Sequence, residues 1–146
     1  VHCQSCGRTY DYEKYGCCPN CGAYNRRPRR EWVDVDGTVF GKPHDAEDAK
    51  RMLRALSGKT HQVHTGVCIA KGDRAEHFVD SCKVTFFPLG EEEIAFYTAT
   101  PEPYDKAGAY AIQGRAALWL DRIEGDYYTI MGLPVSRTVQ LLEHFL

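Results

Sequence analysis

The sequence predicts a mixed α/β domain that follows a small cysteine-rich module. Five of the seven cysteines fall within the first 21 residues, and strand-like and helix-like periodicities alternate from residue 32 onward. The charge also changes sign, because residues 1–30 carry a net charge of +4 and the remaining residues carry −6. With 43% hydrophobic residues, the chain is expected to fold around a core rather than to remain disordered.

The N-terminal cysteines form two Cys-x-x-Cys-Gly motifs. Cys3 and Cys6 make the first, and Cys18 and Cys21 make the second after a gap of eleven residues. Two such turns facing each other supply the four thiolates that tetrahedral zinc prefers, whereas a redox dithiol is the alternative interpretation. We therefore expect residues 1–24 to form a zinc ribbon, in which a structural zinc ion supplies the folding free energy. Cys17 is expected to be a bystander.

The composition of residues 25–31 predicts an exposed basic linker. Four arginines surround Pro28 here, and such a run is usually solvated, although arginines can also contact phosphates or an acidic protein surface. Because the rest of the chain is acidic, nucleic acid is not expected as a partner. Neither a signal-peptide pattern nor an apolar run of membrane-spanning length occurs in the sequence, so the expectation is a cytoplasmic protein without membrane contact.

In the domain expected at residues 32–146, the pattern of the first half predicts a short hairpin, a helix and a long hairpin. Val33–Phe40 alternates about an Asp-Gly pair, which is a strong hairpin signal. Acidic residues early and basic residues late, followed by a glycine, predict a helix over Asp45–Leu56. Period-two alternation then predicts strands over Thr60–Ala70 and Ala75–Phe87, joined by a Gly-Asp turn.

The second half predicts a helix, two strands and a closing helix. Leu89-Gly90 precedes three glutamates, which suit the first turn of a helix because they interact favourably with its dipole. Alternation predicts strands at Ala116–Ile123 and Tyr127–Met131. Pro134 is expected to begin an amphipathic helix whose inward side chains are Val135, Val139, Leu142 and Phe145.

Two clusters in the body carry groups suited to ligand chemistry. Small residues around Asp105, Lys106 and Gln113 leave room for a ligand beside a carboxylate, a cation and an amide. Lys42 lies between a predicted strand and a helix start, which suits a phosphate site. Two alternatives stay open from the residues alone: Lys42 as a surface lysine, and Asp105–Lys106 as an exposed ion pair.

Five sequence blocks between residues 32 and 146 resemble, in order, the Maf family of nucleoside triphosphate pyrophosphatases, also called septum formation inhibitors. The resemblance implies a Maf- and ITPase-like mixed sheet with flanking helices over residues 32–146, truncated at its N-terminal end. The blocks are Gly41-Lys-Pro, Ala55-Leu-Ser-Gly-Lys-Thr-His-Gln-Val-His-Thr-Gly-Val67, Leu89-Gly-Glu-Glu-Glu-Ile94, Glu102-Pro-Tyr-Asp-Lys-Ala-Gly-Ala-Tyr-Ala-Ile-Gln-Gly114 and Gly125-Asp-Tyr-Tyr-Thr-Ile-Met-Gly-Leu-Pro134.

The resemblance also implies an activity, namely hydrolysis between the α- and β-phosphates with a divalent cation such as Mg or Mn. The form of the central block is similar to the branch that acts on dTTP and UTP. By the same resemblance, Lys42 matches the phosphate-binding lysine, and Asp105 and Lys106 match a polar pair that lines the cleft. Gln113 matches the glutamine tied to pyrimidine specificity. Gly108 and Thr65 lie in the matching blocks as further substrate-side positions, and the contribution of Thr65 is expected to be mainly structural.

The family's N-terminal phosphate loop and its catalytic aspartate have no counterpart in the sequence. The position of that general base falls on Arg30, so Glu31 or Asp34 is expected to stand in for it. His61 and His64 are expected to be strand-surface residues. The leading hypothesis is a pyrophosphatase, with a homodimer as a possible assembly. Two other hypotheses stay open. One is a non-catalytic nucleotide-binding module that recruits a partner through its zinc ribbon, and the other is a chain that completes its active site with another polypeptide.

Overall fold

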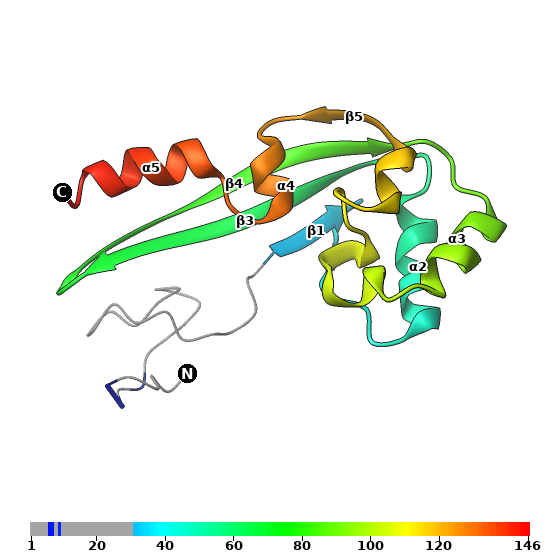
Figure 1. The fold of residues 1–146 in the computed structure, drawn as a ribbon, viewed down its shortest axis with the longest axis horizontal. Helices are drawn as coiled ribbons and strands as arrows, with labels where there is room; N and C mark the ends of the chain where they lie inside the picture. The colour runs from blue at the N-terminus through cyan, green and yellow to red at the C-terminus, as the bar shows by residue number, and fades with distance from the viewer. Residues whose placement is uncertain (1–5, 8, 10–30) are drawn as a thin grey trace.

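A computed structural model describes residues 6, 7, 9 and 31–146, and these last residues form an α/β domain around one five-stranded sheet (Figure 1). All four pairings are antiparallel, so no parallel pair of the expected mixed sheet occurs between the described strands. The strand order is β2-β1-β3-β4-β5, with β1 at Glu31–Val35, β2 at Thr38–Phe40, β3 at Thr60–Lys71, β4 at Arg74–Phe86 and β5 at Leu120–Glu124.

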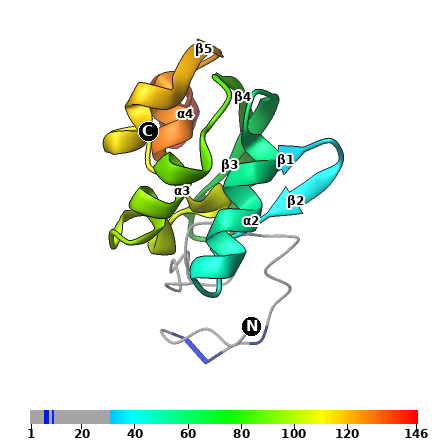
Figure 2. The same cartoon turned by 90° about the vertical axis from the view of Figure 1, so that its right-hand side faces the viewer.

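The helices occupy two regions. Figures 1 and 2 show α2 (Ala46–Leu56) and α3 (Glu91–Thr98) side by side at one end of the sheet, whereas α4 (Tyr127–Met131) and α5 (Val135–Glu143) accompany the β3–β4 hairpin. None of the helices in the described ranges is long and apolar enough to cross a membrane. Three 3₁₀ turns complete the domain: η1 (Glu102–Asp105), η2 (Ala107–Ala109) and η3 (Arg115–Trp119).

The helix α2 forms as the sequence predicted. The Asp45 side chain accepts a hydrogen bond from the backbone N–H of Asp48 at 2.8 Å, which satisfies one of the unpaired donors of the first turn. Arg54 near its end donates to the Glu91 carboxylate of α3 at 2.9 Å, so the two helices are also joined by an ion pair. The buried stripe of α2 consists of the expected residues Ala49, Met52, Leu53 and Leu56.

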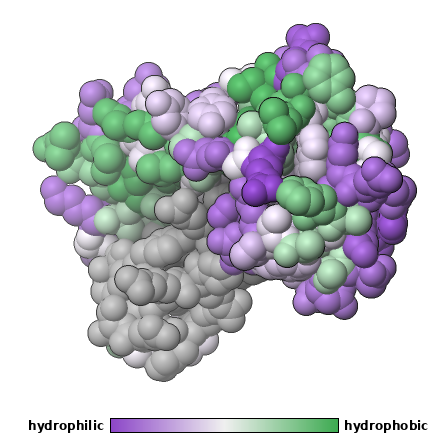
Figure 3. Space-filling view, turned by 45° about the vertical axis from the view of Figure 1, so that its right-hand side comes forward, coloured by the Kyte–Doolittle hydropathy of each residue, from purple (hydrophilic) through white to green (hydrophobic). Residues whose placement is uncertain are grey.

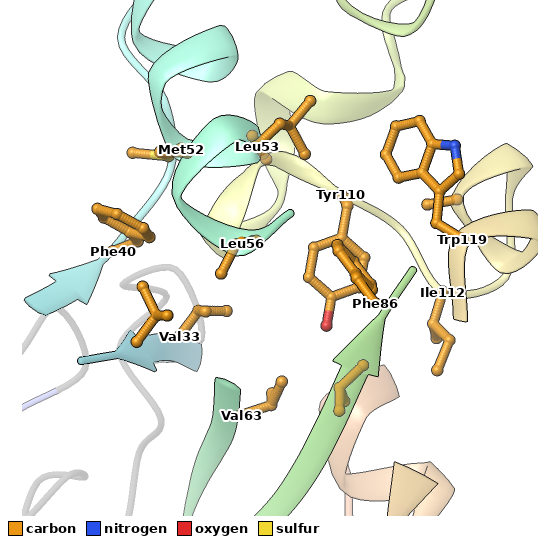
Figure 4. Packing of buried hydrophobic residues seen from close by; sticks show 14 of the residues in the cluster. Val33, Phe40, Met52, Leu53, Leu56, Val63, Phe86, Tyr110, Ile112 and Trp119 are labelled. Atoms are coloured by element: carbon orange, nitrogen blue, oxygen red, sulfur yellow. The ribbon is translucent and has the colours of Figure 1, made fainter. Parts of the chain in front are cut away.

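The core lies between one face of the sheet and the α2 end of the domain. Figure 4 shows Leu56 of α2 near Val33 of β1, and Phe86 of β4 beside Tyr110. Phe86 and Tyr110 meet edge to face with ring centroids 4.8 Å apart, and Tyr97 meets Trp119 in the same way at 4.7 Å. Such buried side chains each stabilise the fold by about 1.5–3 kcal/mol.

The β3–β4 hairpin is much longer than the strands beside it. Its register runs from Thr60 opposite Thr85 to Lys71 opposite Arg74, but β1 pairs with β3 only as far as Thr65. The distal half of the hairpin is instead tied to the C-terminal residues. Lys71 donates to the backbone carbonyl of Phe145 at 3.0 Å, and Arg74 donates to that of His144 at 2.7 Å.

The two strands expected after residue 115 need correction. Residues 127–131 form the short helix α4, because the Asp126 side chain accepts the Tyr128 N–H at 2.9 Å and Gly132 ends the turn with a left-handed φ of 107°. The expected strand Ala116–Ile123 begins instead as the 3₁₀ turn η3, and only Leu120–Glu124 pairs with β4. Local alternation is insufficient here, since side-chain capping and the strand pairing decide the conformation.

The apolar stripe of α5 is not buried as the sequence predicted. The helix begins after Pro134 as expected, but Val135, Val139 and Leu142 are 41%, 48% and 42% exposed. Phe145 alone of the four expected inward residues is buried. Apolar side chains accordingly reach the surface, as the green areas on the face drawn in Figure 3 also show.

The expected surface position of His61 is wrong. His61 shares the core-facing side of β3 with Val63 and is only 1% exposed, and its Nε2 lies 2.7 Å from the Tyr110 hydroxyl. Its Nδ1 has no hydrogen-bond partner among the residues that the structure describes. Burial lowers the pKa of His61 to about 4, because the charged imidazolium loses its hydration.

We expect His61 to make the fold acid-sensitive. Its folded pKa lies below the unfolded value of 6.5, so the neutral side chain contributes full stability above pH 6.5. This contribution falls as the pH drops through 6.5 towards 4, by about 3 kcal/mol in all. Urea unfolding between pH 7 and pH 4 should show a shallower decline for His61→Gln than for the wild type. An equal decline would contradict the assignment, and His64→Gln is the control.

Candidate functional site

The two predicted ligand clusters meet through a backbone hydrogen bond. The Gly108 N–H donates to the Gly41 carbonyl oxygen at 3.1 Å, which brings the segment after β2 against the loop that contains η1 and η2. Figure 1 shows this loop, in yellow-green and yellow, beside β1 and α2. Lys42 is therefore adjacent to a residue that contacts the Asp105–Gly108 segment, although the two clusters are far apart in the sequence.

Gly108 makes this close approach possible. Its φ is +71°, a conformation that glycine adopts without steric cost, and it is buried. A Cβ at this position would lie 2.8 Å from Cγ2 of Val33, which is itself buried in β1. The loop therefore packs directly on the core face of the sheet. This geometry gives Gly108 a structural reason to be glycine, independent of any contact with a substrate.

The charged groups at the junction are accessible. Lys42 is exposed, and Lys106 Nζ lies 3.2 Å from Asp105 Oδ2 in an ion pair whose side chains are 42% and 71% exposed. An exposed pair of this kind contributes about 0–1 kcal/mol to stability, so a ligand can replace it at little cost. Lys42 and the Asp105–Lys106 pair are thus accessible charged groups on two segments that a backbone hydrogen bond joins.

Gln113 follows on the same loop, at the tip of a tight turn. The Gly114 N–H donates to the Ala111 carbonyl at 3.1 Å, and the intervening Ile112 is 8% exposed and packs into the core. Gln113 itself is exposed. The turn therefore presents the amide of Gln113 to solvent, while its neighbour anchors the loop beneath.

Two side chains that sequence reasoning did not single out hold this loop. The Tyr97 hydroxyl accepts the Ala111 N–H at 3.0 Å, and the Glu102 carboxylate accepts the Arg115 N–H with both oxygens at 3.3 Å. Burial, with the nearby Glu102 carboxylate as a smaller cause, raises the pKa of Tyr97, so this hydroxyl stays protonated. Glu102 and Gly114 both stand in the sequence block 102–114, and this was the available signal. The contacts from Tyr97 to Ala111 and from Glu102 to Arg115 join residues that are distant in the sequence, so the sequence does not reveal them.

Thr65 lies elsewhere, under α4. It is 2% exposed, and its hydroxyl donates to the Thr129 carbonyl at 2.7 Å. The Thr129 hydroxyl in turn donates to Asp80, whose other oxygen accepts from Arg137 at 2.8 Å. The Thr65 hydroxyl therefore helps to fasten α4 to the hairpin, and its place among the substrate-side positions stays a prediction.

The two candidates for a general base differ in position. Asp34 lies between the buried Val33 and Val35, so strand alternation places it on the opposite face of the sheet from the loop that packs on Val33. Asp34 is therefore not brought to the junction. Glu31 begins β1, where its backbone pairs with Thr65.

No group of three or more histidine, cysteine or acidic residues that could hold a metal occurs within the described ranges. Of the four predicted zinc ligands, Cys3, Cys18 and Cys21 lie outside the described residues, and Cys6 is exposed. The predicted zinc ribbon at residues 1–24 and the linker at 25–31 thus remain predictions.

Comparison with known proteins shows the family to which the chain belongs. The family model described as "Maf-like protein" matches residues 31–145. The chain therefore belongs to the Maf family. It is 53% identical over 113 residues to a protein from Bacillus velezensis named dTTP/UTP pyrophosphatase, and 51% identical over 113 residues to one of the same name from Acholeplasma laidlawii.

These alignments cover 77% of the chain but only 60% of either relative. The chain thus spans about three fifths of the length of the curated relatives it matches. The activity of the relatives is accordingly a hypothesis for this chain.

Proposed function

We propose that this protein hydrolyses nucleoside triphosphates, with dTTP and UTP as substrates, to the monophosphate and pyrophosphate. The observation that carries the proposal is the backbone contact between Gly41 and Gly108, since it places the Lys42 segment against the Asp105–Lys106 segment in a chain of this family. The names of the two relatives support the choice of nucleotides.

In this proposal the chain's own residues bind and orient the triphosphate. The ammonium groups of Lys42 and Lys106 offset the charge that builds on the phosphate oxygens during transfer. When the nucleotide binds, Lys106 would break its ion pair with Asp105 and turn to the phosphates. The Asp105 carboxylate would then be free to face the substrate. Gln113 offers an amide that can pair with the polar edge of a pyrimidine.

A divalent cation such as Mg or Mn supplies charge neutralisation at the phosphates in this class of reaction. The described residues do not fit a preformed cation cage, since no suitable cluster of ligands occurs among them. Magnesium in such sites is commonly held by one or two carboxylates together with the substrate phosphates. The cation is therefore expected to arrive with the nucleotide.

Of the two base candidates, we infer that Glu31 is the better, because Asp34 lies across the sheet from the junction. Glu31 would only stand in for the family's catalytic aspartate, which has no counterpart in this sequence, and lack of an effective general base commonly costs about 10²–10⁴-fold in rate. The chain is thus expected to bind nucleotides yet to turn over slowly.

Release of pyrophosphate from a panel of UTP, dTTP, CTP and ATP tests the proposal. Faster release from UTP and dTTP than from the other two supports it, and slowing by Glu31→Gln but not by Asp34→Asn would identify the base. Absence of both hydrolysis and nucleotide binding would refute it.

The second candidate function is a non-catalytic nucleotide-binding module that recruits a partner through a zinc ribbon. About two fifths of the length of the Bacillus velezensis relative lies outside the alignment, so the match alone does not carry its activity over to this chain. Binding of UTP without any release of pyrophosphate, even at high protein concentration, would select this alternative.

We further propose that residues 1–24 bind one zinc ion through Cys3, Cys6, Cys18 and Cys21, ahead of a basic linker and the Maf-like domain at 32–146. Cys18→Ser should lower the zinc content from one ion per chain to less than about half, because a structural site needs four ligands. Elemental analysis after gel filtration measures this. Full occupancy in Cys18→Ser would overturn the assignment, and Cys17→Ser should retain its zinc.

A further inference from the structure

The backbone on either side of Gln113 is held by two side chains from elsewhere in the chain. On one side, the Tyr97 hydroxyl of α3 accepts the Ala111 N–H at 3.0 Å. On the other side, both oxygens of the Glu102 carboxylate lie 3.3 Å from the Arg115 nitrogen. These two acceptors bracket the turn that carries Gln113.

Shape reinforces this arrangement at Gly114. A Cβ built on Gly114 would overlap the carboxylate of Glu102, so the carboxylate occupies the volume that any side chain there would need. The turn and the carboxylate therefore fit each other closely. Among the described residues the Glu102 carboxylate forms no ion pair, and it interacts with the Arg115 N–H and with the nearby Tyr97 hydroxyl.

The core holds the Tyr97 side chain in place. It is 1% exposed, and its ring packs edge to face on Trp119 with centroids 4.7 Å apart. Ile112, within the turn, is also buried. The position of Gln113 thus depends on a buried aromatic pair and on one carboxylate, whereas Gln113 itself has no hydrogen bond to a described residue.

We propose that Glu102 and Tyr97 are positioning residues that fix the Gln113 turn, and thereby set the preference for the pyrimidine base. The inference rests on the proposed function, because it takes Gln113 as the group that reads the base. A fixed backbone limits which rotamers bring the Gln113 amide to the base, and this limits its freedom to rotate and satisfy a carbonyl and an amino group equally well.

Equilibrium binding of UTP, CTP and inorganic tripolyphosphate tests this role. UTP and CTP differ at the pyrimidine edge, whereas tripolyphosphate reports only on the phosphate side. The variants are Glu102→Ala, Glu102→Gln, Tyr97→Phe and Gln113→Ala, and the matched control is Glu92→Ala, which removes an exposed glutamate from the first turn of α3.

The wild type is expected to prefer UTP over CTP. Gln113→Ala and Glu102→Ala should each reduce this preference by about tenfold and leave tripolyphosphate binding unchanged. Glu102→Gln should retain most of the preference, because its amide oxygen can still accept the Arg115 N–H. Amide hydrogen exchange at Arg115 should accelerate in Glu102→Ala only, which a merely structural effect elsewhere would not produce.

If Glu102→Ala does not fold, Tyr97→Phe tests the positioning role instead, since it removes the hydroxyl and keeps the ring on Trp119. Retention of the wild-type preference in both Glu102→Ala and Tyr97→Phe, with loss in Gln113→Ala, would overturn the positioning role and leave the proposed function intact. A wild type that binds UTP and CTP equally would refute base reading at Gln113 and, with it, this inference. Failure to bind tripolyphosphate would instead count against the phosphate site.

Discussion

Lys42→Glu is expected to weaken UTP binding by about 100-fold and to abolish any release of pyrophosphate. Lys42 is exposed next to Gly41, the residue that accepts the Gly108 hydrogen bond. Replacing a cation with an anion at a triphosphate site removes an attraction and adds a repulsion, and because solvent screens the charges at this exposed position, the two effects together should reach about 100-fold in affinity. Isothermal titration with UTP measures the affinity.

Lys83→Glu is the matched control for this charge reversal. Lys83 is an exposed lysine of β4 between the buried Cys82 and Val84, so it lies on the face of the sheet opposite the core. Its reversal makes the same change in net charge and should alter UTP affinity by no more than about twofold. Equal losses in both variants would show that only net charge matters, and wild-type affinity in Lys42→Glu would exclude Lys42 from the phosphate site.

Gly108→Ala should destabilise the fold by about 3 kcal/mol. A left-handed conformation costs a residue with a Cβ about 1–2 kcal/mol, and overlap in a packed core adds about 1–3 kcal/mol. Both apply here, because φ is +71° and the new Cβ would lie 2.8 Å from Val33. Urea unfolding monitored by tryptophan fluorescence gives the free energy of unfolding.

The second substitution Val33→Ala separates the two causes. It removes Cγ2 and Cγ1 of Val33, which the new Cβ would meet at 2.8 and 3.3 Å, and leaves only the Val33 Cβ at 3.2 Å, so the double variant should lose less stability than the sum of the single variants. Gly66→Ala is the control, since Gly66 is an extended residue of β3 with open space around it. A Gly108→Ala protein as stable as Gly66→Ala would contradict the close packing of the loop on β1.

The elements that the sequence predicted correctly are those defined by local interactions. The helix α2 has its cap at Asp45 and its apolar stripe within eleven residues, and the β3–β4 hairpin is joined by a short turn. The segment Tyr127–Met131 was wrongly expected to be a strand, because aromatic and β-branched residues favour strands locally. Its helical form depends on a cap at Asp126 and on the distant Thr65 hydroxyl.

The candidate site divides in the same way. Lys42, Asp105 and Lys106 could be selected from residue type and neighbouring small residues, because those properties are visible in the sequence. The supporting contacts from Tyr97 to Ala111 and from Glu102 to Arg115 could not, since each depends on how α3 and the loop pack together. The exposed stripe of α5 shows a further limit, because an amphipathic pattern does not specify what covers it.

The length of the β3–β4 hairpin has a consequence for local unfolding. Beyond Thr65 neither β1 nor α2 supports the hairpin, and Lys71 and Arg74 are tied instead to the carbonyls of Phe145 and His144. Opening of the distal hairpin and detachment of the C-terminal residues are therefore expected to form a single cooperative event, separate from opening of the core around Tyr110. We therefore expect two regions of different opening free energy, with the segments that carry Lys42 and Gly108 at the more protected end, beside the core.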